Sequence, residues 1–443
     1  MRSLPLAMRI PLSALPAFLL LTASAHAQPP LAQSIATDYQ ETLGPLFEYF
    51  HANPELSFRE TKTSARIAQE LRALGYQVTE GIGRTGVVAV MENGAGPTVL
   101  IRADMDGLPI EEDTGLPYAS KARQVDLDGK EKPVMHACGH DVHITSLIGT
   151  AMQMAERKSE WRGTLVLAAQ PAEEIISGAR EMIEDGLYTD FPKPDYAFAL
   201  HVSSEMPTGK LLVKGGPVYS SSDSVDLIVR GVGAHGASPH KGIDPVLVAA
   251  QIVVSLQSLV SRTLSPLDAG VVTVGSIHGG IKHNIIPDEV KLELTVRSDK
   301  PEVREQLLEG IERVARGVAV SMDVPEDLMP IVKPSKTRTT PPTRNDPALA
   351  AALRTTFAKH FGEDVLYESD RTGMGAEDFA YFVAPEHDVK GVYFRVGGTP
   401  ADQVASAPSH HSPFFKISPE PSIRVGTEAM TVAAMSMMGK AKR

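Results

Sequence analysis

The stretch of the chain richest in reactive side chains is residues 135–143, which hold three histidines and the only cysteine of the protein. Cys138 and His140 lie two residues apart, a spacing that fits a turn from a strand into a helix, where free backbone N–H groups and the ligands of a cation converge. The apolar residues that follow have helical spacing, so His140 and His143 lie near one helix face. A lone cysteine or histidine is usually a buried core residue, but four such residues in nine favour a metal site.

Further candidate ligands follow three predicted strands. In an open α/β sheet, ligands bind at the carboxyl ends of the strands, so side chains placed there gather at one edge, beside Cys138 and His140. These side chains are Asp104 and Asp106 after strand 98–103, Glu173 and Glu174 after strand 164–169, and His201 after strand 196–200.

The donors at this edge are more than one divalent ion needs, which predicts a two-metal site with a bridging water of lowered pKa. The candidate ligands are Cys138, His140, Glu174, His201 and, further along the chain, His411. Glu173 is then the spare acid, placed to take a proton from the water and pass it to the leaving nitrogen. Glu-Glu pairs usually mark a solvated face, but a buried strand edge favours function.

Composition limits the classes of function. A chain of 443 residues favours two domains, and its net charge of −11 disfavours nucleic-acid partners. With one cysteine, no internal disulfide can form. Basic residues, an apolar run at 10–22 and Ala25-His26-Ala27 are typical of a signal peptide cleaved after Ala27. We therefore expect a soluble, exported, periplasmic protein that keeps no membrane contact after cleavage; the alternative is an uncleaved anchor.

The pattern of elements changes near residue 216. The segment after it predicts a βαββαβ unit, a ferredoxin-like sandwich that can fold as one inserted domain. Its expected elements are strand 224–229, helix 245–262, strands 270–277 and 290–296, helix 302–317 and strand 319–323. The proline-rich stretch 325–342 is expected to return the chain to the first domain. The predicted organisation is a signal peptide at 1–27, a catalytic domain at 36–215 and 336–443, and an inserted domain at 216–335.

Seven stretches, in order along the chain, resemble one known family. The resemblance is to the aminoacylase, hippurate hydrolase and auxin-conjugate hydrolase group of dinuclear metallo-amidohydrolases, related to carboxypeptidase G-type metallopeptidases. The matching stretches are 102–109, 135–143, 170–174, 231–240, 279–288, 375–379 and 411–413. The resemblance implies an α/β fold: a zinc-peptidase-like catalytic domain with a mixed sheet and an inserted lid and dimerisation domain.

Carried over by motif, the resemblance implies metal binding by the five ligands named above and general acid/base catalysis by Glu173. The exopeptidase relatives have a His-x-Asp pair where this chain has Asp104-Met105-Asp106, so Cys-x-His supplies ligands instead. Asp106 is expected to orient a ligand histidine without touching metal, and Asp104 has no assigned role. The stretch 375–379 is expected to line the substrate pocket.

Three residues of the inserted domain are implied to act on the substrate. His235 is expected to reach the active site of the partner subunit and stabilise the oxyanion. Asn284 and Arg297 are expected to hold the substrate carboxylate, for which the fork of arginine is suited. The ordinary alternatives are an asparagine in a turn before proline and an arginine that ends a strand.

The function expected from these features is hydrolysis of N-acyl amino acids, such as hippurate or N-acetyl amino acids, by a metal-bound hydroxide. We expect two divalent ions per chain (Zn, Mn, Co or Ni), a small-molecule or short-peptide substrate, and a homodimer or tetramer. The alternatives are an exopeptidase (dipeptidase or carboxypeptidase) and a non-catalytic protein that binds metal or peptide. A pure binding protein has no need of Glu173 beside its ligands.

Overall fold

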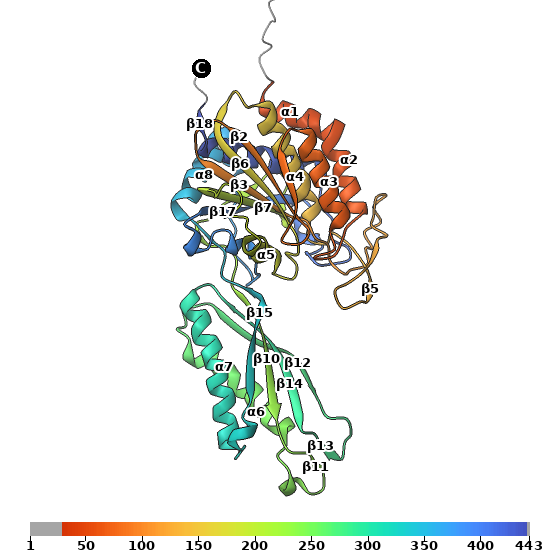
Figure 1. Ribbon diagram of the computed structural model, residues 1–443, viewed down its shortest axis with the longest axis vertical. Helices are drawn as coiled ribbons and strands as arrows, with labels where there is room; N and C mark the ends of the chain where they lie inside the picture. The colour runs from red at the N-terminus through yellow and green to blue at the C-terminus, as the bar shows by residue number, and fades with distance from the viewer. Residues whose placement is uncertain (1–28, 441–443) are drawn as a thin grey trace, which may run out of the picture.

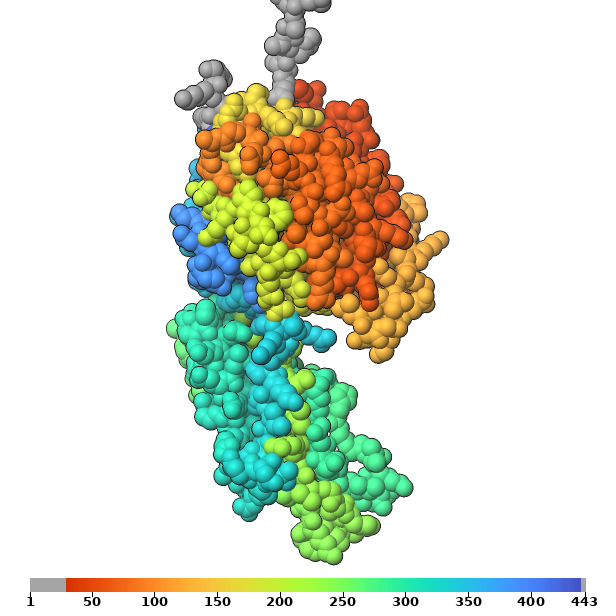
Figure 2. Space-filling view, in the orientation of Figure 1, coloured from red at the N-terminus to blue at the C-terminus, as the bar shows by residue number. Residues whose placement is uncertain are grey.

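The computed structural model describes residues 29–440, so the predicted signal segment 1–27 lies outside the described residues. Figure 1 shows a larger body built from the N-terminal and C-terminal parts of the chain, and an elongated body built from its middle. Figure 2 shows a narrow waist between the two. The mixed α/β fold that the sequence predicts is confirmed.

An eight-stranded mixed sheet forms the centre of the larger body, in the order β1-β2-β6-β3-β7-β17-β8 with β18 paired to β6. Its strands are β1 (Gln77–Ile82), β2 (Gly86–Asn93), β3 (Thr98–Asp104), β6 (Trp161–Gln170), β7 (Tyr196–Pro207), β8 (Leu211–Leu212), β17 (Lys390–Thr399) and β18 (Gly439–Lys440). Strands β6, β3, β7 and β17 are parallel. Their carboxyl ends therefore meet at one edge of the sheet, where ligands bind in such folds.

Helices cover both faces of this sheet, which explains why its central strands are near-continuous apolar runs. Helix α5 and the segment 378–382 pack on one face, and the longer helices pack on the other. The helices are α1 (Leu31–Asp38), α2 (Gly44–Ala52), α3 (Thr61–Ala73), α4 (His140–Glu156), α5 (Gly178–Glu184), α8 (Pro347–Phe361) and α9 (Pro419–Met437).

Helix α4 begins at the sheet edge because of a glycine. Gly139 precedes the helix with φ of 86°, and a Cβ at this position would lie 2.4 Å from Cγ1 of Val202 on β7. Only glycine combines that backbone conformation with so close an approach. The Cys-Gly-His sequence therefore lets α4 start directly against strand β7.

The inserted body is a four-stranded antiparallel sheet in the order β12-β14-β10-β15, with two helices packed on one face. Its elements are β10 (Ser222–Arg230), α6 (Pro245–Ser258), β12 (Gly270–Gly279), β14 (Glu289–Ser298), α7 (Pro301–Ser321) and β15 (Ile331–Thr340). We call this body the lid. Its order of elements, βαββαβ, is that of the predicted ferredoxin-like sandwich.

The fourth strand of the lid lies elsewhere than predicted. Residues 319–321 belong to α7, where Ala319 continues the buried helical spacing of Ile311 and Ala315. The prediction of a strand at 319–323 is therefore wrong, and the strand is β15, inside the proline-rich stretch read as a linker. Proline is tolerated there because β15 is an edge strand, and β15 runs past the predicted domain limit at 335.

Three short strand pairs complete the described part of the chain. They are β4 (Arg123–Val125) with β5 (Glu131–Pro133), β9 (Gly216–Pro217) with β16 (Arg344–Asn345), and β11 (Ala234–His235) with β13 (Ile285–Ile286). The first lies between β3 and α4, the second where the chain enters and leaves the lid, and the third at the distal end of the lid (Figure 1).

Candidate active site

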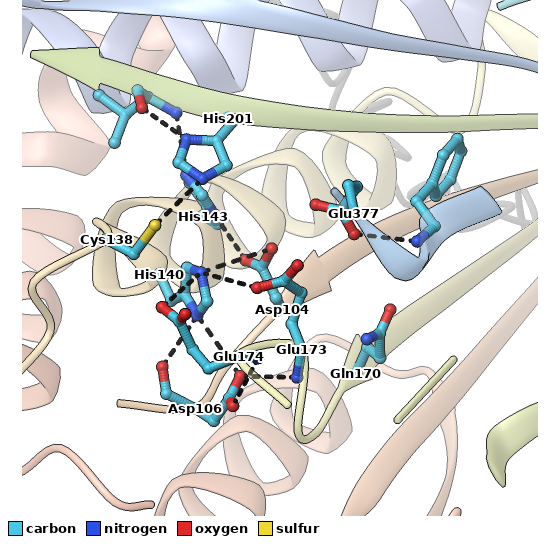
Figure 3. A network of polar contacts seen from close by, with 12 residues as sticks. Asp104, Asp106, Cys138, His140, His143, Gln170, Glu173, Glu174, His201 and Glu377 are labelled. Atoms are coloured by element: carbon cyan, nitrogen blue, oxygen red, sulfur yellow. Dashed lines mark hydrogen bonds and ion pairs between the residues drawn. The ribbon is translucent and has the colours of Figure 1, made fainter. Parts of the chain in front are cut away.

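A cavity of about 620 Å³ opens at the carboxyl edge of the central sheet, where the lid meets the larger body. One part of its wall carries the predicted ligands and the spare acid, and another part carries arginines. The ligand wall includes Cys138, Glu173, Glu174, His201, His410 and His411, and the arginines are Arg297, Arg371 and Arg395. Figure 3 shows the ligand side chains turned toward one another from different elements.

Cys138 and His201 face each other across this wall. His201 Nδ1 lies 2.6 Å from the carbonyl oxygen of Val202, so this nitrogen carries the ring proton and the Nε2 lone pair is free. That Nε2 lies 3.4 Å from Cys138 Sγ. Two ligands of one zinc ion have about this separation, because Zn–S and Zn–N bonds are about 2.3 and 2.0 Å long.

His140 presents a second nitrogen to the cluster. Its Nδ1 donates to the backbone carbonyl of Asp106 at 2.8 Å, and its Nε2 faces the carboxylates of Glu173 and Glu174 at 3.9 and 3.8 Å. Among the described residues, this buried Nε2 and the buried Oε1 of Glu174 have no hydrogen-bond partner, and they lie 3.8 Å apart. Orphaned buried polar atoms are costly. A cation between them satisfies both.

The last predicted ligand, His411, is one of two adjacent histidines. His411 Nε2 lies 3.4 Å from Glu174 Oε2, and its backbone is held at φ of 63° by a bond from its N–H to the carbonyl of Ala137. His410 accepts from the Ser204 N–H at Nε2, so its protonated Nδ1, 3.8 Å from Cys138 Sγ, is a donor toward the sulfur. This tautomer leaves His411 as the better ligand.

Asp106 contacts the ligand histidine His140, as the prediction expects. Its backbone carbonyl accepts from His140 Nδ1 at 2.8 Å, and its carboxylate Oδ1 lies 3.5 Å from the same nitrogen. The carboxylate also accepts from the backbone N–H groups of Glu173 and Glu174 at 3.0 and 3.1 Å and from the hydroxyl of Ser57 at 2.6 Å. Asp106 therefore positions the loop that carries the spare acid.

Asp104, to which the sequence assigned no role, lies at the centre of a buried network with His143 and Arg102. Asp104 contacts His143 Nδ1 at 2.5 Å and Arg102 Nη1 at 2.7 Å. Arg102 also pairs with Glu377 at 2.7 Å and Asp378 at 3.2 Å. The 375–379 stretch therefore supports the floor of the site through Arg102. A charged residue inside the apolar run of β3 was the sequence signal for this network, since a buried charge needs partners.

The electrostatics of the cluster favour a cation. Burial, followed by the charges of Glu377 and Glu174, raises the pKa of Glu173 well above its usual value, and burial raises the pKa of Glu174 to about 8. Burial and the neighbouring His143 and His410 lower the pKa of His201 well below its usual value. A divalent ion supplies the positive charge that lets both carboxylates ionise.

The ligand atoms form overlapping groups that fit more than one ion. In each of the groups Cys138–His201–His410, Cys138–Glu174–His411 and His140–Glu173–Glu174, the ligand atoms lie within 4.8 Å of one another. His410 is a donor toward the sulfur, so Cys138 and His201 are the ligands that the first group offers. Because the second group shares Cys138 with the first and Glu174 with the third, the cluster can hold neighbouring ions. The residues present therefore fit divalent metal.

The structure separates the three lid residues predicted to contact substrate. Arg297 lines the cavity, and its Nε donates to Thr295 Oγ1 at 3.1 Å. His235 in β11 and Asn284 beside β13 are exposed at the distal end of the lid and do not line the cavity of their own chain (Figure 1). Sequence reasoning did not single out His410, Arg371 and Arg395, which do line it.

Comparison with known proteins gives consistent matches. Peptidase family M20/M25/M40 matches residues 100–436. The hippurate hydrolase of Campylobacter jejuni is 38% identical over 349 residues, covering 78% of this chain and 86% of that protein. The N-acetyl-L-cysteine deacetylase of Bacillus subtilis is 36% identical over 370 residues, covering 83% and 82%. The crystal structure of a dinuclear metal-binding M20 peptidase from Bacillus subtilis matches with a TM-score of 0.73 at 30% identity, covering 92% of this chain and 99% of that one.

Proposed function

This chain belongs to peptidase family M20/M25/M40, and on that premise we propose that it is a metal-dependent amidohydrolase that cleaves N-acyl amino acids at the amide bond. The observation that carries the proposal is the position of Glu173. This buried carboxylate lies 3.9 Å from Nε2 of His140 and borders the cavity. Amide hydrolysis needs a proton-transfer group beside the metal ligands, whereas a protein that only binds metal or peptide has no need of one.

The cluster takes divalent metal, and we propose two ions per chain, held by Cys138, His140, Glu174, His201 and His411. Bound divalent ions polarise the scissile carbonyl and make water a stronger nucleophile. Thiolate and imidazole ligands favour zinc, while the carboxylates also suit manganese, and cobalt or nickel can occupy the same set.

Glu173 moves the proton. Its carboxylate borders the cavity, where it is placed to take a proton from the attacking water and return it to the leaving nitrogen. Asp106 keeps Glu173 in place through the backbone of the loop. Arg297, on the lid wall of the cavity, supplies the cation for the carboxylate of the amino acid.

We propose that two chains associate through the lid. Helix α6 and the π-helical segment that continues it, Pro245–Thr263, are predominantly apolar, yet only 28% of their most apolar 18-residue window is buried. The outward side chains Leu247 and Val254 are 51% and 68% exposed, and β12 is a free sheet edge. An apolar helix face beside a free edge fits a second copy of the lid. In such a dimer, the exposed His235 and Asn284 of one chain can reach the active-site cavity of the partner chain.

We also propose export with cleavage after Ala27, from the basic, apolar and Ala-x-Ala pattern at the N-terminus. Mass spectrometry of the protein recovered from the periplasm tests this, and a chain that still contains residues 1–27 contradicts it.

The experiment that tests the activity uses purified residues 28–443 with hippurate, N-acetylmethionine and a set of dipeptides. Each is assayed with and without a chelator, alongside metal counting by mass spectrometry. Chelator-sensitive hydrolysis of the acyl amino acids, with up to two ions per chain, is the expected result. Hydrolysis of dipeptides alone indicates an exopeptidase, and bound metal without turnover on any substrate indicates a binding protein.

A further inference from the structure

Arg395 is a charged residue in the middle of a buried strand. It lies on β17 in register with His201 on β7, and its neighbours Phe394 and Val396 are 1% and 0% exposed. Arg395 itself is half-buried and lines the active-site cavity. The strand therefore carries a guanidinium to the wall beside a predicted metal ligand.

An aromatic surface holds this guanidinium. Arg395 Cζ lies 5.3 Å from the centroid of the Tyr219 ring, within the range of a cation–π contact. Tyr219 packs edge-on against Tyr393 at 5.3 Å between ring centroids, and the Tyr393 hydroxyl donates to Glu377 at 2.6 Å. Arg395 is therefore pre-positioned, as a binding group needs to be.

The charge of Arg395 has no close counter-ion. Among the described residues no carboxylate forms a salt bridge with it, and the acid that acts on it through space, Glu205, is exposed. Arg371 lines the same cavity; it pairs with Asp299, but its Nη1 is buried and has no hydrogen-bond partner in the described part of the chain. A half-buried guanidinium without a counter-ion, beside a second one with an unused donor, points to an anionic ligand.

A smaller hollow of about 100 Å³ adjoins the cavity on this side, and both arginines line it. Tyr219 and Glu205 line both spaces, and Lys214, which lines the hollow but not the cavity, is already paired with Asp370 at 3.4 Å. The hollow therefore extends the cavity beyond His201 by enough room for a short chain that ends near Arg395 and Arg371.

We propose that Arg395, with Arg371, binds a second carboxylate of the substrate, so that the favoured substrates are N-acyl amino acids that carry two carboxylates. The inference rests on the proposed function, in which Arg297 takes the carboxylate next to the scissile amide. The second carboxylate can come from a dicarboxylic acyl group or from an acidic amino-acid side chain, and the guanidinium pair recognises the same chemistry in both.

The test compares matched substrates that differ in this one charge. N-succinyl-alanine is assayed against its terminal amide, and N-acetylglutamate against N-acetylglutamine. A preference within the first pair places the second carboxylate on the acyl group, and a preference within the second pair places it on the amino-acid side chain. With the wild-type enzyme, kcat/KM is expected to be at least about tenfold higher for the charged member of one pair, since hydrogen bonds between charged groups are stronger than those between neutral groups.

The Arg395→Gln variant is expected to lose about 10- to 100-fold in kcat/KM on the dianionic substrate and less than about threefold on its neutral partner. Arg395→Lys keeps the charge but loses the forked guanidinium, so its kcat/KM on the dianionic substrate is expected to lie between the values of the wild type and of Arg395→Gln. The matched control is Arg72→Gln, which removes one positive charge at an exposed pair with Glu80, away from the cavity. Metal content and the unfolding midpoint are measured for each variant.

Equal losses on charged and neutral substrates, or no preference in the wild type, overturn the inference while leaving the proposed function intact. If no acyl amino acid is hydrolysed, the proposed function fails instead. Calorimetric titration with succinate and glutarate then still tests the anion site. Binding to the wild type that is weakened by Arg395→Gln supports the inference, and unchanged affinity in the variant contradicts it.

Discussion

Asp104 Oδ1 lies 2.5 Å from His143 Nδ1, and this pair ties three elements of the site together. His143 Nε2 accepts from the backbone N–H of Val202 at 2.9 Å, so the ring proton is on Nδ1 and points at Asp104. The contact joins the carboxyl end of β3 to helix α4 and to strand β7 beside His201. The geometry of the ligand wall depends on this buried link.

Replacing Asp104 with Asn is therefore expected to weaken both the fold and the metal site. The change leaves Arg102 with less counter-charge at a fully buried position, which costs about 3 kcal/mol of unfolding free energy. Metal affinity is expected to fall by about 10- to 100-fold, because the support of the ligands loosens. Urea unfolding and chelator competition measure the two effects, and Asp195→Asn is the control at an exposed strand end. An unchanged metal affinity contradicts the role given to Asp104.

Glu173→Gln separates chemistry from metal binding. The variant keeps the shape of the side chain but cannot accept a proton, so kcat is expected to fall by about 10²- to 10⁴-fold while the metal count is unchanged. Glu184→Gln, at an exposed position on α5, is the matched control. A variant that retains turnover rules out Glu173 as the general base.

Cys138→Ser tests the thiolate ligand. Oxygen is a harder ligand than sulfur, so zinc binding is expected to weaken more than manganese binding. Loss of about 1.4 kcal/mol from a ligand contact raises the Kd for zinc about tenfold. Titration of the chelator-treated protein with each metal gives the two values. Equal affinities in the variant and the wild type would falsify thiolate ligation.

A dimer in which His235 serves the partner's site predicts complementation between inactive chains. His235→Ala and Glu173→Gln homodimers are each expected to be impaired. A mixed dimer has one intact site, formed by Glu173 of one chain and His235 of the other, so mixing and re-equilibrating the two variants is expected to restore activity. Light scattering follows the dimer, and Val254→Glu on the exposed face of α6 is expected to yield monomers. Failure to complement places His235 outside the partner's site.

The pH dependence of stability is expected to report on His51. Burial alone lowers the pKa of this side chain, but hydrogen bonds to Asp141 at 2.7 Å and Glu112 at 3.1 Å raise it to about 9. A raised pKa in the folded state stabilises the protein fully below about pH 6.5, and this contribution is lost as the pH rises through 9. The shift corresponds to at most about 3 kcal/mol.

The measurement is urea unfolding of the metal-loaded protein at a series of pH values from 6 to 10, compared with His51→Gln. The variant is expected to be less stable at pH 6 and to lose less stability between pH 6.5 and 9.5. Parallel curves for the two proteins would show that the His51 pair does not carry the dependence.

Local signals in the sequence were enough to predict which side chains gather at the sheet edge. Cys138, His140 and Glu174 are close in space because local signals place each of them where a strand ends or a helix begins, and parallel strands bring such ends together. The period of the apolar residues likewise predicted the order of elements in the lid up to its last strand. That strand was missed because its prolines read as a linker, and only the edge position of β15 makes them acceptable.

Tertiary structure alone decided the roles of residues whose partners are distant in sequence. Asp104 and Arg102 meet Glu377 and His143 across the core, and local patterns carry no information on such pairings. Tertiary structure also decided where His235 and Arg395 lie. His235 is far from the cavity of its own chain because the lid is long. Arg395 borders that cavity because of the register of β17 against β7. A sequence specifies side-chain chemistry and local conformation, whereas packing sets which charges remain unpaired and available to a ligand.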